Sequence, residues 1–130
     1  MKLTVTKQKI ILGDKLFNLN DIDFLMLDKK IRLYKSNGTT AVLNGGFDYN
    51  ECVDTFLDIA FLVAKINKNF IVVNNRVINL ANIRSLETCK SGVIISTEGF
   101  ELRLTDLSKA CMAELTQKFS EINTKAKVAL

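Results

Sequence analysis

Basic residues and one tyrosine lie close together around the segment Ile31–Lys35. On a β-strand, successive side chains point to opposite faces, so the apolar pair Ile31 and Leu33 is expected to face the core. Arg32 and Tyr34 then face solvent. Nucleic-acid binding without sequence preference uses Lys and Arg along the phosphate backbone and aromatic rings on which bases stack. This strand therefore predicts a basic-aromatic sheet face that binds single-stranded DNA or RNA.

Seven more basic residues extend this predicted surface. The formal net charge is +4, and residues 1–35 alone contain eight Lys or Arg against four Asp or Glu. Such a surplus permits an anionic partner but does not require one, because charged side chains on an outer face often only solvate it. The residues predicted to bind nucleic acid are Lys7, Lys9, Lys29, Lys30, Arg32, Tyr34, Lys35, Arg76 and Arg103.

Enzyme chemistry is not indicated by the residue types. The sequence contains no His, which excludes His-based metal sites and Ser–His or Cys–His nucleophile pairs. Its three Cys are an odd number with no C-x-x-C pair. The acidic residues Asp54 and Asp58 lie one turn apart on a predicted helix and are expected to be solvated. We therefore expect a protein that is not an enzyme and needs no metal or cofactor.

An internal duplication organises the chain. Lys9–Ile22 (KIILGDKLFNLNDI) aligns without a gap with Phe70–Ile83 (FIVVNNRVINLANI), 61 positions later, and apolar residues match apolar residues. Gly13–Asp14 matches Asn74–Asn75, and both pairs suit a two-residue hairpin turn because Gly, Asn and Asp tolerate positive φ. Each copy is therefore predicted to begin with a β-hairpin.

Two further strands and a helix are predicted after each hairpin. The strands are Ile31–Lys35 and Thr39–Leu43 in the first half, and Val93–Thr97 and Phe100–Leu104 in the second. Apolar residues at helical spacing predict helices over Asn50–Ile66 and Leu107–Ile122. Asp48 or Asn50 is expected to cap the first, and Asp106 or Ser108 the second.

The predicted fold is α+β, built from two tandem β-β-β-β-α repeats. Residues 1–69 form the first repeat and residues 70–124 the second. One such unit buries one sheet face at best, so the antiparallel sheets are expected to pack with two helices in one shared core, around a pseudo-two-fold axis. Residues 125–130 are expected to be a flexible tail.

The motif Asn-Leu-x-x-Ile, present in both copies, predicts a bend. Its Leu and Ile (Leu19 and Ile22 in the first copy) are three residues apart, so they cannot lie on one face of a regular strand. A bulge or bend between them would restore the register. Asn18 and Asn79, which begin the two motifs, are expected to bond to backbone groups that the bend frees.

Two family resemblances are present. Tandem β-β-β-β-α units over residues 3–122 resemble the Whirly and Pur families of single-stranded nucleic-acid-binding proteins, in which two such units form paired curved sheets with packed helices. Val77–Glu87 with Gly92–Leu104 (VINLANIRSLE and GVIISTEGFELRL) is similar to the opening strands of LytTR-type DNA-binding domains. The first resemblance implies single-stranded nucleic acid as the partner.

The alternative is a protein-interaction or assembly module, which would bind a protein partner through exposed strands or the Gly45–Gly46 loop. Edge strands could also extend a sheet into a second copy, giving a homo-oligomer. No apolar run is long enough to span a membrane and no signal peptide is indicated, so the expected location is cytoplasmic. Asn, Ile and Lys are abundant (12, 12 and 14), as in AT-rich phage genomes, and for a phage-encoded protein the location is the host cytoplasm.

Overall fold

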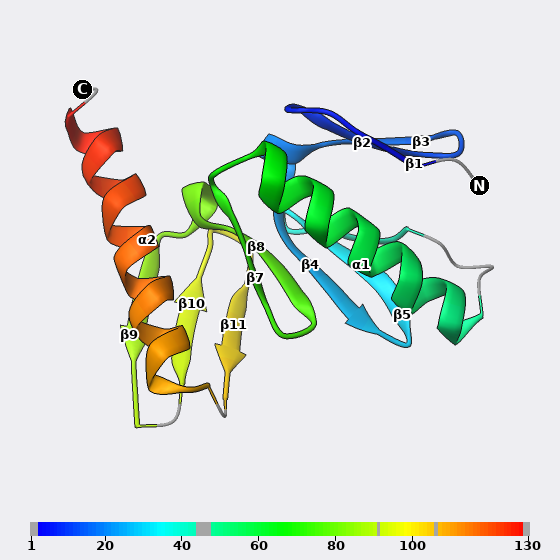
Figure 1. The fold of residues 1–130 in the computed structure, drawn as a ribbon. Coiled ribbons are helices and arrows are strands. Elements are labelled where there is room, and N and C mark those ends of the chain that lie inside the picture. Colours follow the sequence, from blue (N-terminus) through cyan, green and yellow to red (C-terminus); the bar gives the residue numbers. More distant parts are fainter. Residues whose placement is uncertain (1–2, 44–47, 91, 106, 129–130) are drawn as a thin grey trace.

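The computed structural model describes residues 3–43, 48–90, 92–105 and 107–128, with side chains as far as residue 122. Within these residues the chain forms eleven β-strands in three antiparallel sheets, together with two α-helices (Figure 1). The predicted α+β class is confirmed, as are both helices. Neither helix, over the part that is described, is long and apolar enough to cross a membrane.

Sheet A contains the first three strands in the order β1-β2-β3, so β1 and β3 are its edges. The turn between β2 and β3 is the predicted Gly13–Asp14 hairpin, and Gly13 has the positive φ of 64° that such turns use. The bounds of the strands are β1 Leu3–Val5, β2 Lys9–Leu12 and β3 Lys15–Asn18.

Sheet B has five strands in the order β6-β5-β4-β8-β7 and contains strands from both halves of the chain. The two halves meet where β4 pairs with β8, with Phe24 opposite Ile78, Leu25 opposite Val77 and Met26 opposite Arg76. The predicted Asn74–Asn75 turn joins β7 to β8, and Asn74 has φ 54°. The bounds are β4 Ile22–Asp28, β5 Lys30–Lys35, β6 Thr40–Val42, β7 Phe70–Val73 and β8 Arg76–Asn79.

Sheet C has three strands in the order β11-β10-β9, and helix α2 lies against it (Figure 1). Helix α1 lies between sheets A and B and contacts β1, β4, β5 and β7. The bounds are β9 Ser85–Thr88, β10 Val93–Ser96, β11 Glu101–Leu104, α1 Tyr49–Ile66 and α2 Lys109–Val128.

Each helix is capped at its N-terminus by one of the residues predicted to cap it. An oxygen of Asp48 accepts a hydrogen bond from the Glu51 amide at 2.8 Å, and Ser108 Oγ accepts one from the Cys111 amide at 3.1 Å. The alternative cap Asp106 lies outside the described residues. Helix α2 extends to Val128, which is within the expected tail 125–130, and residues 129 and 130 are not described.

Buried apolar side chains form two clusters, one on each face of sheet B. The cluster between sheets A and B and α1 includes Leu25 and Phe56, and the cluster toward sheet C and α2 includes Phe24 and Leu115. The adjacent residues Phe24 and Leu25 therefore point into different clusters. Because β4 is covered on both faces, its sequence is a continuous apolar run instead of an alternating one.

The second half contains one strand more than the predicted four-strand unit, and the first half contains two more. Strands β4 and β9 were not predicted; they follow two short 3-10 turns, η1 (Leu19–Asp21) and η2 (Leu80–Asn82), β4 directly and β9 after two residues. These turns are the predicted bends. The β-β-β-β-α description is therefore wrong by one strand in each half, and the first half has β1 in addition. These strands were missed because β4 lacks the alternation of apolar and polar residues that indicates a strand, and because β9 is short and mostly exposed.

The predicted pseudo-two-fold relation is not confirmed. A two-fold axis would pair the hairpin of each half with the three strands that follow the bend in the other half. It would therefore pair β7–β8 with β4–β6, and β2–β3 with β9–β11. Among the described residues only one of these pairings occurs: β8 joins β4, whereas β3 and β9 each have a neighbour on one side only. The second half therefore docks onto the first without the reciprocal contact.

Two asparagines of the second motif hold the bend of the first. Asn79 is buried, and its Nδ2 donates to the carbonyl oxygens of Ile22 and Leu19 at 3.0 and 3.5 Å. Its Oδ1 accepts from the Ala81 amide at 3.1 Å. The predicted role of Asn79 is thus confirmed, and part of it is directed at the other half of the chain. Asn18 is exposed and makes no such capping bond, so for Asn18 the prediction is wrong.

Asn82 strengthens the same contact between the halves. Its Nδ2 donates to the backbone oxygens of Asn20 and Ile22 at 2.9 and 3.2 Å, and to Asp23 Oδ1 at 3.1 Å. Asp23 is 1% exposed, so Asn82 supplies a donor to a carboxylate that is shielded from water. Asn79 and Asn82 together form what we call the asparagine clamp.

Gly92 permits a close approach between two strands. A Cβ at this position would overlap the carbonyl oxygen of Leu104 and would lie 2.9 Å from its carbonyl carbon. Because backbone atoms cannot move aside without distorting β11, Gly92→Ala is expected to lower the free energy of unfolding by about 3 kcal/mol. Urea unfolding measures this change. Gly38→Ala is the control, since a Cβ there meets nothing within 4 Å and only its positive φ of 87° opposes it. A smaller loss for Gly92→Ala than for Gly38→Ala would contradict the packing described here.

Candidate nucleic-acid interface

Two arginines from different halves of the chain lie in one row across sheet B. Arg32 on β5 and Arg76 on β8 are both directly opposite Met26 on β4. Residues opposite each other on paired strands project to the same face, so the three side chains share one surface. Neighbouring strands are about 4.8 Å apart, which places the backbones of the two arginines roughly 10 Å from each other. Strand pairing between the halves thus assembles a pair of cations.

This row lies at the tips of two hairpins. Lys29, with φ 61°, is the residue between β4 and β5, and Lys30 begins β5 opposite Asp28. The Leu27 amide donates to the Asn75 carbonyl oxygen at 2.9 Å and connects this tip to the β7–β8 tip. Both tips point downward in Figure 1. We refer to Lys29, Lys30, Arg32 and Arg76 as the hairpin-tip cluster.

No member of the hairpin-tip cluster forms an ion pair with any described carboxylate. The ion pairs in the described part of the chain are Arg84–Glu98, Arg103–Glu101 and Lys118–Glu114, all on exposed side chains. Arg76 is half-buried, and its Nε is buried without a hydrogen-bond partner. A buried donor that lacks an acceptor costs free energy, and phosphate is an anion that guanidinium groups bind well. The cluster is therefore electrostatically open to an anion.

Tyr34 is not the solvent-facing ring that the sequence predicts. Its ring is half-buried, with edge-to-face contacts to Phe24 at 6.2 Å and Phe100 at 5.0 Å between ring centroids. The expectation placed solvent on this face of β5, but the face is covered by the second cluster of apolar side chains, which includes Phe100 of the second half. Tyr34 stabilises the contact between the halves and is not a free platform for a base.

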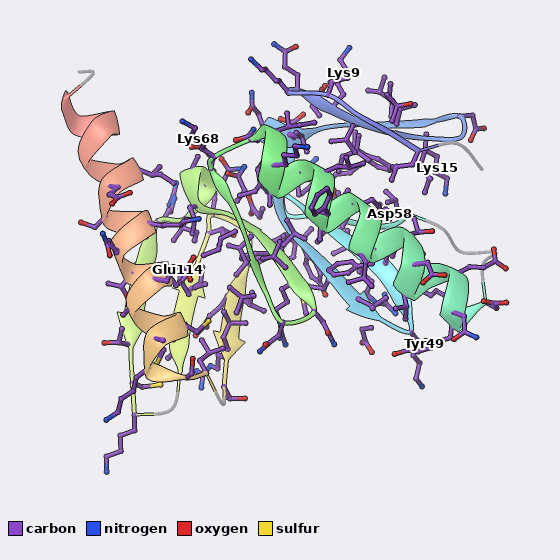
Figure 2. All side chains as sticks on the ribbon, in the orientation of Figure 1. Lys9, Lys15, Tyr49, Asp58, Lys68 and Glu114 are labelled. Carbon is purple, nitrogen blue, oxygen red and sulfur yellow. The ribbon has the colours of Figure 1, made fainter. Side chains whose placement is uncertain are left out.

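The remaining predicted residues lie elsewhere. Lys7 is exposed in the turn between β1 and β2, and Lys9 (labelled in Figure 2) is exposed at the start of β2, opposite Asn18. Lys35 is half-buried at the end of β5, with Nζ 5.7 Å from the centre of the Phe17 ring. Arg103 is on β11, where its guanidinium is 3.5 Å from Glu101. The structure thus brings together four of the nine predicted residues.

Met26 belongs to the surface of the hairpin-tip cluster and was not predicted from the sequence. It is half-buried, and it is the apolar side chain that lies between Arg32 and Arg76 in the row. The signal that could have located it is the uninterrupted apolar run of β4, which is typical of a strand covered on both faces.

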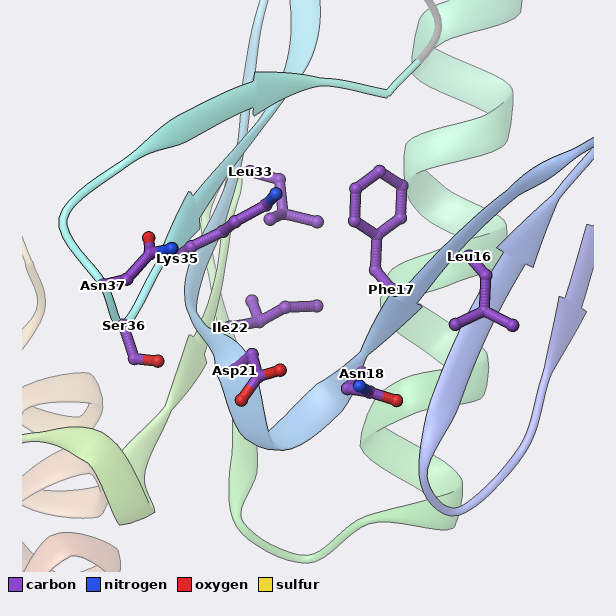
Figure 3. A pocket seen from close by; sticks show the side chains of 9 residues that line it. All are labelled: Leu16, Phe17, Asn18, Asp21, Ile22, Leu33, Lys35, Ser36 and Asn37. Carbon is purple, nitrogen blue, oxygen red and sulfur yellow. The ribbon is translucent and has the colours of Figure 1, made fainter.

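A separate pocket of about 340 Å³ opens between β3 and the end of β5 (Figure 3). It has a mixed polar and apolar lining and contains one lysine and one aspartate. Among the described residues, no group of three or more His, Cys, Asp or Glu side chains is arranged to hold a metal ion. The lining residues are Leu16, Phe17, Asn18, Asp21, Ile22, Leu33, Lys35, Ser36 and Asn37.

Three antiparallel sheets with two packed helices define this chain as an α+β domain. The solved LytTr DNA-binding domain of a protein described as a methyl-accepting/DNA response regulator from Bacillus cereus has a similar structure. The TM-score is 0.52, and the match covers 92% of this chain and 96% of that one. The LytTR likeness predicted from Val77–Leu104 is therefore confirmed at the level of the fold.

The sequences of the two proteins are only 14% identical, so the likeness establishes the shared fold alone. It does not show the Whirly or Pur fold. No protein-family model matches the sequence, and no curated protein matches it.

Proposed function

We propose that this protein is a non-enzymatic DNA-binding protein that contacts the phosphate backbone through the hairpin-tip cluster. The observation that supports this most strongly is the row Arg32–Met26–Arg76, in which two guanidinium groups from different halves share one face without a carboxylate partner. The net charge of +4 and the fold shared with a DNA-binding domain agree with it.

The choice between a single strand and a duplex is the finer part of the proposal. Phosphate contacts alone do not distinguish a single strand from a duplex, whereas stacking on an aromatic ring does. The ring of Tyr34 is engaged by Phe24 and Phe100, so the hairpin-tip cluster acts mainly through charge. We therefore expect the affinities for a duplex and for one of its strands to agree within about tenfold.

Fluorescence anisotropy with a labelled duplex, and separately with one labelled strand, tests both statements. The wild-type protein is expected to bind with a dissociation constant below about 10 µM at low salt, and the affinity should fall steeply as salt is added. Absence of binding to either nucleic acid at low salt would refute the proposed function. Binding to the single strand alone would leave DNA binding intact and refute only the expectation that the cluster acts mainly through charge and binds both forms about equally.

Binding to a protein partner is the second candidate function, and one observation favours it. Leu57 and Phe61 lie one turn apart on α1 and are 58% and 66% exposed. Exposed apolar side chains that adjoin one another are a common feature of protein contact sites. A complex that survives nuclease treatment and is lost in the double variant Leu57→Ser, Phe61→Ser would support this function. The Gly45–Gly46 loop, which the sequence also suggests as a contact, lies outside the described residues.

A further inference from the structure

The two halves of the chain contain equivalent segments, but only one of the two possible contacts between them is formed. Strand β8 of the second half joins β4 of the first half, and the asparagine clamp then holds the bend that precedes β4. In the aligned segment, β3 is the counterpart of β8 at an offset of 61 positions. Continuing the same offset past Ile22 and Ile83 makes β9 the counterpart of β4. The reciprocal contact, β3 with β9, is not made within the chain.

Both strands of this missing contact are open on the relevant side. Strand β3 is paired with β2 alone, and β9 with β10 alone. The pocket shown in Figure 3 separates β3 from the end of β5, so no described strand pairs with β3 there. One contact near this edge is between side chain and backbone: Lys15 Nζ donates to the Val42 carbonyl oxygen at 3.4 Å. Open strand edges present unpaired backbone groups, and a strand of another chain can satisfy them.

We propose that β3 of one molecule pairs antiparallel with β9 of a second copy of this chain, repeating the β8–β4 contact between molecules. Displacing the internal register by 61 positions gives the expected pairs: Phe17 opposite Ser85, Leu16 opposite Leu86, and Lys15 opposite Glu87. Two of the three pairs are chemically complementary. An apolar side chain meets an apolar one, and a cation meets an anion.

The exposure of Leu16 agrees with this pairing. Leu16 is 51% exposed, whereas its counterpart Val77 in the internal contact is fully buried. Leu86, its expected partner, is half-buried on sheet C and packs against the cluster that includes Leu115. Pairing between two copies would therefore shield an apolar side chain that is otherwise in water.

The counterpart of the asparagine clamp is also complementary. Asn18 occupies the place of Asn79, makes no capping bond of its own, and would donate to the backbone oxygens of Leu80 and Ile83 in the second copy. Where the internal contact has Asn82 beside Asp23, the contact between copies would have Asp21 beside Arg84. Both Asp21 and Arg84 are exposed, and Arg84, which lies 3.8 Å from Glu98 within one chain, would then have carboxylates on both sides.

Such a contact is head-to-tail, because each copy uses β3 on one side and β9 on the other. Repeated contacts of this kind give a closed ring if the rotation between copies closes, and an open chain of copies if it does not. The inference rests on the internal contact and is independent of DNA binding.

Light scattering coupled to size-exclusion chromatography, on the full chain without DNA from about 1 µM to about 1 mM, tests the proposal. We expect a molar mass that rises above the 14.6 kDa of one chain as concentration increases. Lys15→Glu and Glu87→Lys should each raise the dissociation constant about fivefold, because like charges then face each other. The double variant, which exchanges the two charges, should restore association. Lys65→Glu on α1 is the control and should leave it unchanged.

Two results would overturn the proposal. One is a mass of a single chain throughout the concentration range. The other is association that the two single variants do not weaken, or that the double variant does not restore. Far-ultraviolet circular dichroism and urea unfolding of each variant verify that it is folded.

Discussion

Replacing Asn79 with leucine is expected to lower the free energy of unfolding by about 3 kcal/mol. Leucine has a similar volume but offers neither donor nor acceptor. Within the described residues, the change leaves Asn82 as the remaining side-chain donor to the carbonyl oxygen of Ile22, and it removes the only side-chain acceptor of the Ala81 amide. Both groups are at the contact between the halves, where Asn79 is 2% exposed and water cannot easily replace it. Urea denaturation followed by circular dichroism measures the loss.

The duplication provides a matched control for this prediction. Asn18 has the same place in the first motif, but it is exposed and makes no capping bond. Asn18→Leu should therefore change the free energy of unfolding by no more than about 0.5 kcal/mol, as surface substitutions usually do. Equal losses for Asn79→Leu and Asn18→Leu would show that the asparagine clamp does not hold the halves together.

The double variant Arg32→Gln, Arg76→Gln is expected to reduce DNA affinity by about 50-fold at 0.1 M salt. Each phosphate contact releases bound counterions, so loss of two contacts should lower the slope of log K against log salt by about 2. Glutamine keeps much of the side-chain length and introduces no negative charge, so sheet B is expected to stay folded. Anisotropy titrations of the labelled duplex at several salt concentrations give both the affinity and the slope.

The control variant for this experiment removes the same number of positive charges at a different place on the protein. Lys65→Gln with Lys118→Gln removes two positive charges from the outer surfaces of α1 and α2 and leaves the hairpin-tip cluster intact. We expect this variant to lose less than about threefold in affinity, because only long-range attraction is reduced. If the two double variants weaken binding equally, the net charge and not the hairpin-tip cluster determines the affinity.

Local signals in the sequence predicted the local structure well. The Gly13–Asp14 and Asn74–Asn75 turns, both helices and the bends at the Asn-Leu motifs are specified by neighbouring residues, and all are present. The overlooked strands are those whose signal is not local. Strand β4 becomes a central strand only because β8, some fifty residues later, pairs with it and both faces are covered. Without that partner, its apolar run does not distinguish a strand from a buried helix.

The candidate site was predicted only in part for the same reason. Lys29, Lys30 and Arg32 are neighbours in sequence, and their proximity was foreseeable. That Arg76 joins them depends on the register of β8 against β4, which no short-range pattern encodes. The prediction that Tyr34 faces solvent was wrong because alternation along β5 distinguishes the two faces of the strand but does not indicate whether the outer face is covered. Phe100 and the rest of the second half cover it.

The measurement that most directly tests DNA binding by the hairpin-tip cluster is a titration of the protein with duplex DNA followed by the chemical shifts of its backbone amides. The account predicts that the largest shift changes occur at the β4–β5 and β7–β8 turns, including Lys29, Arg32 and Arg76. Changes concentrated instead at Lys7, Lys9 and the pocket beside Lys35, with the two hairpin tips unaffected, would contradict it.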